Sequence, residues 1–159
     1  MSGWSRDDWR RWRALDGADR RLLVEAGIFV TLAEVSLKLL PFRRTARLFG
    51  LRENRSSAAP GNTPPGGRVP VAAARSAWAV ERAATRTPLP GKCLAQALAG
   101  SAMLGRRRIP TTVHLGVAKD PRGTGALGAH AWLRCGGAVL TGASGSELFT
   151  PVAAFDVHV

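Results

Sequence analysis

The stretch TPLPGKCLAQALAGSAMLGRRRIP (87–110) places a cysteine directly after a Pro-Gly break, at the start of a predicted helix over residues 93–105. The three arginines at 106–108 follow the helix, where cations interact favourably with a helix C-terminus. A cysteine in the first helical turn meets unpaired backbone N–H groups and the positive end of the helix dipole, which both stabilise a thiolate. Cys93 is therefore a candidate nucleophile; the alternative is a small buried core residue.

Beyond this helix the hydrophobic period changes from helical to alternating. In TTVHLGVAK (111–119) the Val and Leu residues alternate with polar or small ones, as in a half-buried strand. Two further strand-like runs, AHAWLRC (129–135) and AVLTG (138–142), are separated by Gly136 and Gly137, a strong signal of a hairpin with positive φ in its turn. Helices followed by an antiparallel sheet indicate an α+β fold.

The N-terminal third is predicted to be helical. Over residues 5–40, Asp16 offers a cap and apolar residues then recur at three- and four-residue spacing until Pro41 ends the helix. A short basic stretch predicts another turn or two of helix, and a stretch rich in Pro, Gly, Ser and Asn follows it. We expect a helical segment over 1–51, a flexible linker or loop over 52–70, and a core over 71–159 that begins with one more helix.

The composition narrows the class of protein. A chain of 159 residues has room for one compact domain, and its formal net charge of +12 favours an acidic partner such as nucleic acid, an anionic membrane or an acidic peptide. The N-terminus MSGWSRDDWRRWR has charges where a secretory signal needs an apolar run, so we expect a cytoplasmic protein. The apolar stretch 22–40 contains three charged residues and is a poor membrane span.

A histidine downstream strengthens the reading of Cys93 as a nucleophile. A thiol nucleophile needs a base that takes its proton and later returns it to the leaving amine. His130 lies on the first strand of the predicted hairpin, in AHAW. A helix cysteine followed by a strand histidine is more specific than either residue alone.

The second half of the chain, roughly residues 88–155, resembles a known family. The pieces CLAQALAGSAMLGRRRIPTTVHLGVAKD, GAHAWLRCGGAVLTG and FTPVAAF occur in the order found in lasso peptide biosynthesis B proteins, in their stand-alone leader-peptidase form. The resemblance implies a papain-like, transglutaminase-like cysteine protease that uses Cys93 as nucleophile and His130 as general base and acid, without a cofactor. It also implies three partners: the precursor peptide, a separate leader-binding protein, and an asparagine-synthetase-like cyclase.

The third catalytic residue departs from the family pattern, which has an aspartate on the strand after the histidine. A two-residue turn places Ala143 opposite His130 and Thr141 opposite Trp132, and neither is a carboxylate. Our preferred candidate is Glu147, beyond the hairpin. Asp156, Thr141, a backbone carbonyl, or a Cys-His dyad without a third residue are the alternatives.

The remaining cysteines and histidines lack the spacing of a metal site, so we expect none. We predict that Cys135 is structural and that His114 is exposed to solvent. The segment WSRDDWRRWR (4–13) mixes tryptophan and arginine as nucleic-acid-binding segments do, but we favour a helix with Trp9 and Trp12 packed inward, and expect no nucleic-acid partner.

Two other functions stay open: an amidase or acyl transferase with the same fold, and a basic nucleic-acid-binding adaptor with Cys93 in its core. Contact of the N-terminal helices with a membrane is also left open.

Overall fold

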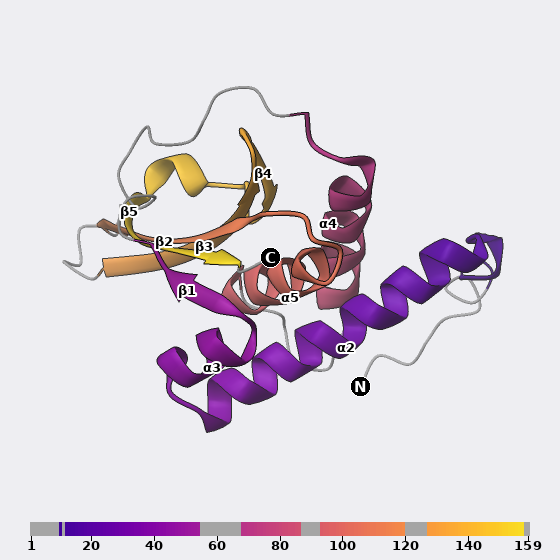
Figure 1. Ribbon diagram of the computed structural model, residues 1–159, viewed down its shortest axis with the longest axis horizontal. Helices are drawn as coiled ribbons and strands as arrows, with labels where there is room; N and C mark the ends of the chain where they lie inside the picture. The colour runs from indigo at the N-terminus through magenta and orange to yellow at the C-terminus, as the bar shows by residue number, and fades with distance from the viewer. Residues whose placement is uncertain (1–9, 11, 55–67, 87–92, 120–126, 158–159) are drawn as a thin grey trace.

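The computed structural model describes residues 10, 12–54, 68–86, 93–119 and 127–157. Its helices lie on one side of a twisted antiparallel sheet (Figure 1), which confirms the predicted α+β class. In chain order the elements are α2 (Gly17–Leu39), α3 (Phe42–Leu48), β1 (Leu51–Glu53), α4 (Val71–Ala84), α5 (Cys93–Gly105), β2 (Thr112–Lys119), β3 (Leu127–Cys135), β4 (Ala138–Thr141), the 3-10 turn η2 (Ser146–Leu148) and β5 (Thr150–Val157).

The five strands follow the order β1-β5-β2-β3-β4, and every pairing is antiparallel. The sequence predicted β2, β3 and β4, but not the two strands on the other side of β2. In β1, Arg52 pairs with Asp156 and Glu53 with Phe155, so the predicted linker over 52–70 begins inside a strand. Residues 55–67 of that linker lie outside the described residues.

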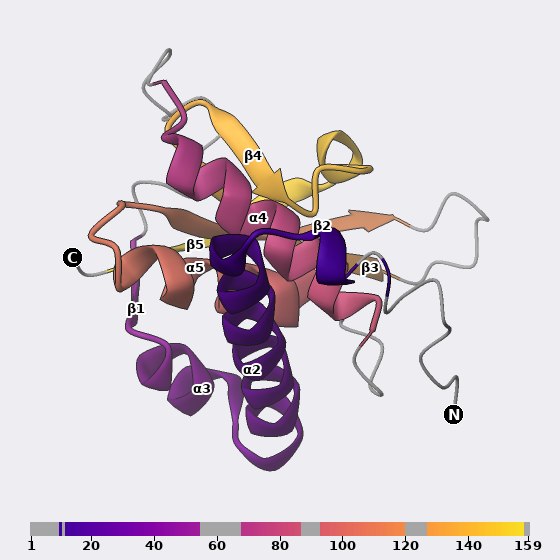
Figure 2. The same cartoon turned by 90° about the vertical axis from the view of Figure 1, so that its right-hand side faces the viewer.

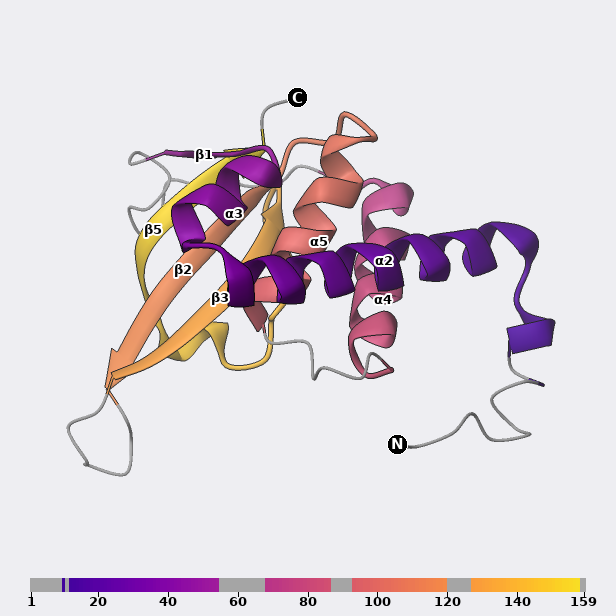
Figure 3. The ribbon, with the colours of Figure 1, turned by 90° about the horizontal axis from the view of Figure 1, so that it is seen from below.

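Helix α5 lies between the sheet and the other two long helices, α2 and α4 (Figure 3). One side of α5 packs on β3 so closely that a Cβ added at Gly100 would lie 2.7 Å from Leu133 Cδ2. The sheet-side core contains Leu98, Leu104, Val113, Leu133 and Val157 among its buried residues. The other side of α5 contributes to a helical core, which includes Leu23, Val30, Val80 and Met103.

Helix α2 crosses the outside of the helical layer (Figure 2). Its N-terminus is capped as predicted, since the Asp16 carboxylate accepts a hydrogen bond of 2.6 Å from the Asp19 backbone N–H. Leu40 is already extended, and Pro41 ends the helix. Trp12 packs against the helical core as expected, whereas Trp9 lies outside the described residues. Nowhere in the described part of the chain does a helix have the length and apolar character needed to cross a membrane.

An ion pair joins α2 to the turn after α5. The two terminal nitrogens of Arg107 donate to the two carboxylate oxygens of Glu25 at 3.0 and 2.6 Å, and one of them also donates to the Met103 carbonyl at 2.7 Å. The hydrogen bond to Glu25 raises the pKa of Arg107, with burial acting in the opposite direction. The arginine therefore caps the C-terminus of α5, as the sequence predicted, and ties it to α2.

Candidate active site

Cys93 is the first residue of α5, which confirms its predicted place at a helix start. Its thiol is free and partly buried, and it packs against the sheet-side core. The first N–H groups of a helix have no intrahelical acceptor and, together with the helix dipole, favour an anion. The Pro-Gly break before this helix lies within 87–92, outside the described residues.

His130 lies on β3 in a small aromatic cluster. Its ring centroid is 6.0 Å from that of Trp132 and 5.1 Å from that of Phe149. Its Nε2 lies 2.8 Å from the carbonyl oxygen of Gly142. Because a carbonyl only accepts hydrogen bonds, Nε2 carries the proton and donates it, so in the neutral ring Nδ1 has the free lone pair. The atom of His130 that can act as a base is therefore Nδ1.

The approach of the Gly142 carbonyl depends on a register shift that the sequence analysis did not predict. Thr141 pairs with Leu133, whereas Arg134 pairs with Val139, so Leu140 is an extra residue in β4. The prediction that Thr141 lies opposite Trp132 is therefore wrong. Ala143, expected opposite His130, lies beyond the end of β4.

Gly142 is the residue that this bulge brings against β3. It has a φ of +71°, and a Cβ at this position would lie 2.5 Å from the Ala131 carbonyl oxygen and 3.2 Å from Trp132 Cα. Only glycine fits without displacement of the backbone. The chain thus places a neutral backbone carbonyl at Nε2 of His130, one of the alternatives considered for the third group.

The carboxylates considered for the third group lie elsewhere. Glu147 is exposed on η2, and within the described residues no hydrogen bond or ion pair joins it to His130. Asp156 lies on β5, where it accepts a hydrogen bond of 2.7 Å from Thr112 Oγ1 and another from the Asn54 side chain. A role for Glu147 in orienting His130 stays a prediction.

Cys93 and His130 come from two elements that pack together. On β3, Ala131 and Leu133 belong to the sheet-side core with α5, whereas His130 and Trp132 lie at the alternate positions of the strand. Both candidate residues are described, and no hydrogen bond joins the Cys93 thiol to the His130 ring. Alternate positions of a strand face opposite sides of the sheet, so the described structure does not bring the His130 ring to the Cys93 thiol.

His114 is buried, which corrects the prediction that it is exposed to solvent. Its ring stacks on Trp132 at a centroid distance of 5.6 Å, and the residue is 6% exposed. The alternation of β2 was read correctly, but the face assigned to solvent is covered by the Trp132 ring from the neighbouring strand. Burial lowers the pKa of His114, and the charge of Arg134 lowers it further, while Asp156 acts in the opposite direction.

This burial has a measurable consequence for stability. Because the folded-state pKa of His114 lies below the ordinary 6.5, the unfolded chain binds more protons between these two values, so the free energy of unfolding decreases as the pH falls below about 6.5. His114→Phe keeps a ring against Trp132 and removes the titration. We expect the free energy of unfolding, measured with urea at several pH values, to change less steeply with pH in the variant than in wild type. The difference between the two slopes is up to about 1.4 kcal/mol per pH unit. Identical slopes would contradict this role of His114.

Cys135 is buried and free, and burial raises the pKa of its thiol. It therefore lacks the features of a reactive cysteine, in agreement with the structural role predicted for it. Among the residues whose placement is described, no three His, Cys, Asp or Glu side chains gather in a way that would hold a metal ion.

Comparison with curated proteins and with solved structures gave no match. The sequence profile of the Transglutaminase-like superfamily matches residues 36–154. The matched region starts within α2, before the expected core boundary at residue 71, and includes α5 with Cys93 and β3 with His130. This match spans most of the chain, and the protein therefore belongs to the transglutaminase-like superfamily.

Proposed function

We propose that this protein is a cysteine peptidase that removes the leader from a lasso-peptide precursor. The observation that carries the proposal is the position of Cys93 as the first residue of α5 within the matched transglutaminase-like region. Members of this superfamily are typically cysteine proteases or transferases. The resemblance of residues 88–155 to lasso B proteins supports the substrate class, and a separate leader-binding protein and a cyclase as partners.

In the first half of the proposed reaction, Nδ1 of His130 takes the thiol proton and the sulfur of Cys93 attacks the scissile carbonyl carbon. The carbonyl π electrons move to the oxygen, which the backbone N–H of Cys93 helps to stabilise. When the tetrahedral intermediate collapses, the C–N bond breaks and Nδ1 returns the proton to the departing amine of the core peptide. The leader is then held as a thioester on Cys93.

In the second half, Nδ1 of His130 takes a proton from water and the oxygen attacks the thioester carbon. The C–S bond breaks, the leader leaves with a new carboxylate, and the proton returns to the sulfur. Throughout, the Gly142 carbonyl accepts the hydrogen bond from Nε2 at 2.8 Å, which fixes the ring and stabilises its cationic form. A carbonyl provides less stabilisation than the aspartate of the family pattern, because it has no formal charge.

The test uses a lasso-peptide precursor together with a leader-binding protein, in heavy-oxygen water. Mass spectrometry should find one heavy oxygen in the new carboxylate of the leader and a free amine on the core peptide. The same assay with a primary amine added separates hydrolysis from acyl transfer, the alternative that shares this fold. If the leader is recovered mainly as the amide, the protein is a transferase, and an uncut precursor in the presence of all partners would contradict both reactions.

A further inference from the structure

Helix α2 has a second apolar stripe that no other described element covers. The exposed fractions of its members are 51% for Val24, 55% for Ile28, 51% for Leu32, 40% for Val35 and 75% for Leu39. The spacing of three and four residues puts all five on one face of the helix. Contiguous exposed apolar surface of this kind is typical of a contact surface in soluble proteins.

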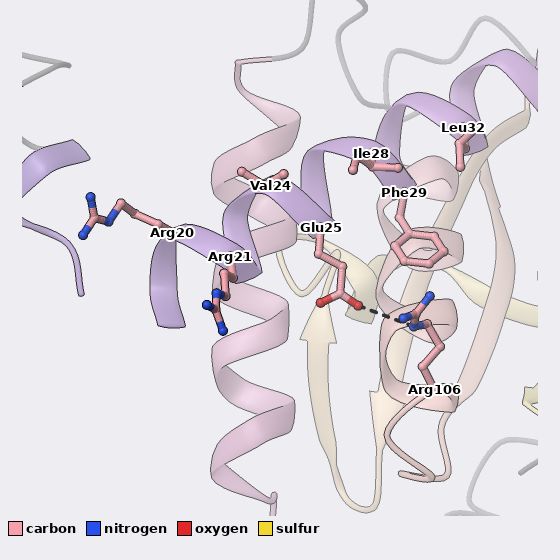
Figure 4. Close-up of a pocket in the computed structure, with 8 residues that line it drawn as sticks. All are labelled: Arg20, Arg21, Val24, Glu25, Ile28, Phe29, Leu32 and Arg106. Carbon is pink, nitrogen blue, oxygen red and sulfur yellow. Dashed lines mark ion pairs between the residues drawn. The ribbon is translucent and has the colours of Figure 1, made fainter. Parts of the chain in front are cut away.

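The N-terminal part of this stripe borders a groove of about 610 Å³. Figure 4 shows that the groove lies between α2 and the turn after α5, with Phe29 of α2 and Arg106 of the turn facing each other. The Arg106 guanidinium carbon lies 5.8 Å from the centroid of the Phe29 ring. Val24, Ile28 and Leu32 contribute the apolar wall.

The groove carries a net positive charge. Arg20 and Arg21 line one end, and neither pairs with a carboxylate of the described residues. Glu25 is the single carboxylate in the lining, and it is already bound by Arg107 and lies 3.8 Å from Arg106. The charge of Glu25 is therefore neutralised, while the arginines at the end of the groove remain available to an anion.

We infer that this groove and stripe dock an acidic amphipathic segment of a partner protein. Apolar side chains of the partner enter the groove beside Ile28 and Phe29, and its carboxylates meet Arg20 and Arg21. A second copy of this chain fits poorly, because it presents the same arginines and carries the same net charge of +12. A lipid bilayer fits poorly too, because a concave groove accepts inserted side chains, which a flat lipid surface does not offer.

The groove adjoins the C-terminal end of α5, whereas Cys93 begins that helix, so the two sites lie roughly 20 Å apart along it. A partner docked here leaves the candidate nucleophile accessible. The inference does not rest on the proposed cleavage reaction, and binding can be measured without it.

The probe is a fluorescent peptide of about 20 residues that forms a helix with Leu on one face and Glu beside it. Fluorescence anisotropy should show binding to the full chain, and Ile28→Ser with Leu32→Ser should weaken it at least ~10-fold, because both side chains lie in the contact. Val71→Ser with Val152→Ser is the matched control, since these residues are also exposed, at 76% and 55%, but lie elsewhere. Equal binding by both double variants would overturn the inference.

Charge specificity is tested by a second pair of variants. Arg20→Glu with Arg21→Glu should abolish binding, whereas Arg43→Glu with Arg44→Glu, which changes the net charge equally on α3, should leave it within about twofold. A peptide with Lys in place of Glu, and a scrambled acidic peptide, should not bind. Equal losses in the two arginine pairs would show only general charge attraction and overturn the inference.

The other occupants are tested with the same variants. Co-sedimentation with vesicles of phosphatidylserine and phosphatidylcholine, and sedimentation velocity of the chain alone, should give the same result for wild type and for the Ile28/Leu32 variant. If the variant instead loses vesicle binding or self-association while it still binds the peptide, the surface serves a membrane or a second copy, and the inference is wrong.

Discussion

Cys93→Ala is expected to reduce cleavage of the precursor by about 10³-fold or more, because no other residue forms the thioester in the proposed reaction. The change removes one sulfur atom at the partly buried start of α5, so the fold should persist. Cleavage is followed by mass spectrometry under single-turnover conditions, and circular dichroism verifies the helical content.

Cys135→Ala is the matched control for this variant. It also removes a thiol, but one buried on β3 whose pKa is raised by burial, so it should lower stability slightly and leave the cleavage rate within a few fold. Binding of the acidic peptide to α2 should be unchanged in both variants. Full activity of the Cys93 variant would exclude the cysteine peptidase mechanism, yet leave the docking surface on α2 untouched.

Gly142→Ala is expected to lower the free energy of unfolding by about 2–5 kcal/mol. A non-glycine residue at its φ of +71° costs about 1–2 kcal/mol. The added Cβ would also lie 2.5 Å from the Ala131 carbonyl, a backbone contact whose relief by movement costs about 1–3 kcal/mol more. The same movement displaces the carbonyl that holds His130, so kcat for cleavage should fall while KM changes little.

Gly145→Ala is the control that separates these two costs. Gly145 has a similar φ of +80°, but nothing lies within 4 Å of the position of an added Cβ. The Gly145→Ala variant should lose only the cost of its positive φ, about 1–2 kcal/mol in the free energy of unfolding, and retain nearly full activity. Equal losses of stability and kcat in the two variants, measured by urea unfolding and steady-state kinetics, would show that Gly142 makes no special contact with β3.

The bulge at Leu140 explains how a backbone carbonyl reaches Nε2 of His130. The bulge turns the chain so that Gly142 approaches Ala131 too closely for any side chain. At this place the backbone itself supplies the acceptor for Nε2. In the proposed mechanism, the residue that fixes the imidazole is therefore a glycine, which acts through its backbone carbonyl, and not an acidic residue.

Features that depend on neighbours in the sequence were predictable. The start of α5 at Cys93, the end of α2 at Pro41 and the two-residue turn between β3 and β4 all follow from caps, breakers and alternation within a few residues. In that turn only Gly136 has a positive φ, 56°, so the structure needs the freedom of one glycine where the sequence suggested two.

Features that depend on residues far away in the sequence were not predictable. In β1 and β5, Leu51 pairs with Val157, which lies 106 residues further along the chain, and a three-residue strand such as β1 has no periodic signal of its own. The burial of His114 depends on the Trp132 ring, and the hydrogen bond of His130 depends on one extra residue in β4. The sequence alone thus determined the helix that carries the candidate nucleophile and the strand that carries the candidate base. Their neighbours were decided by strand order and register, because one residue of shift exchanges every contact across a sheet.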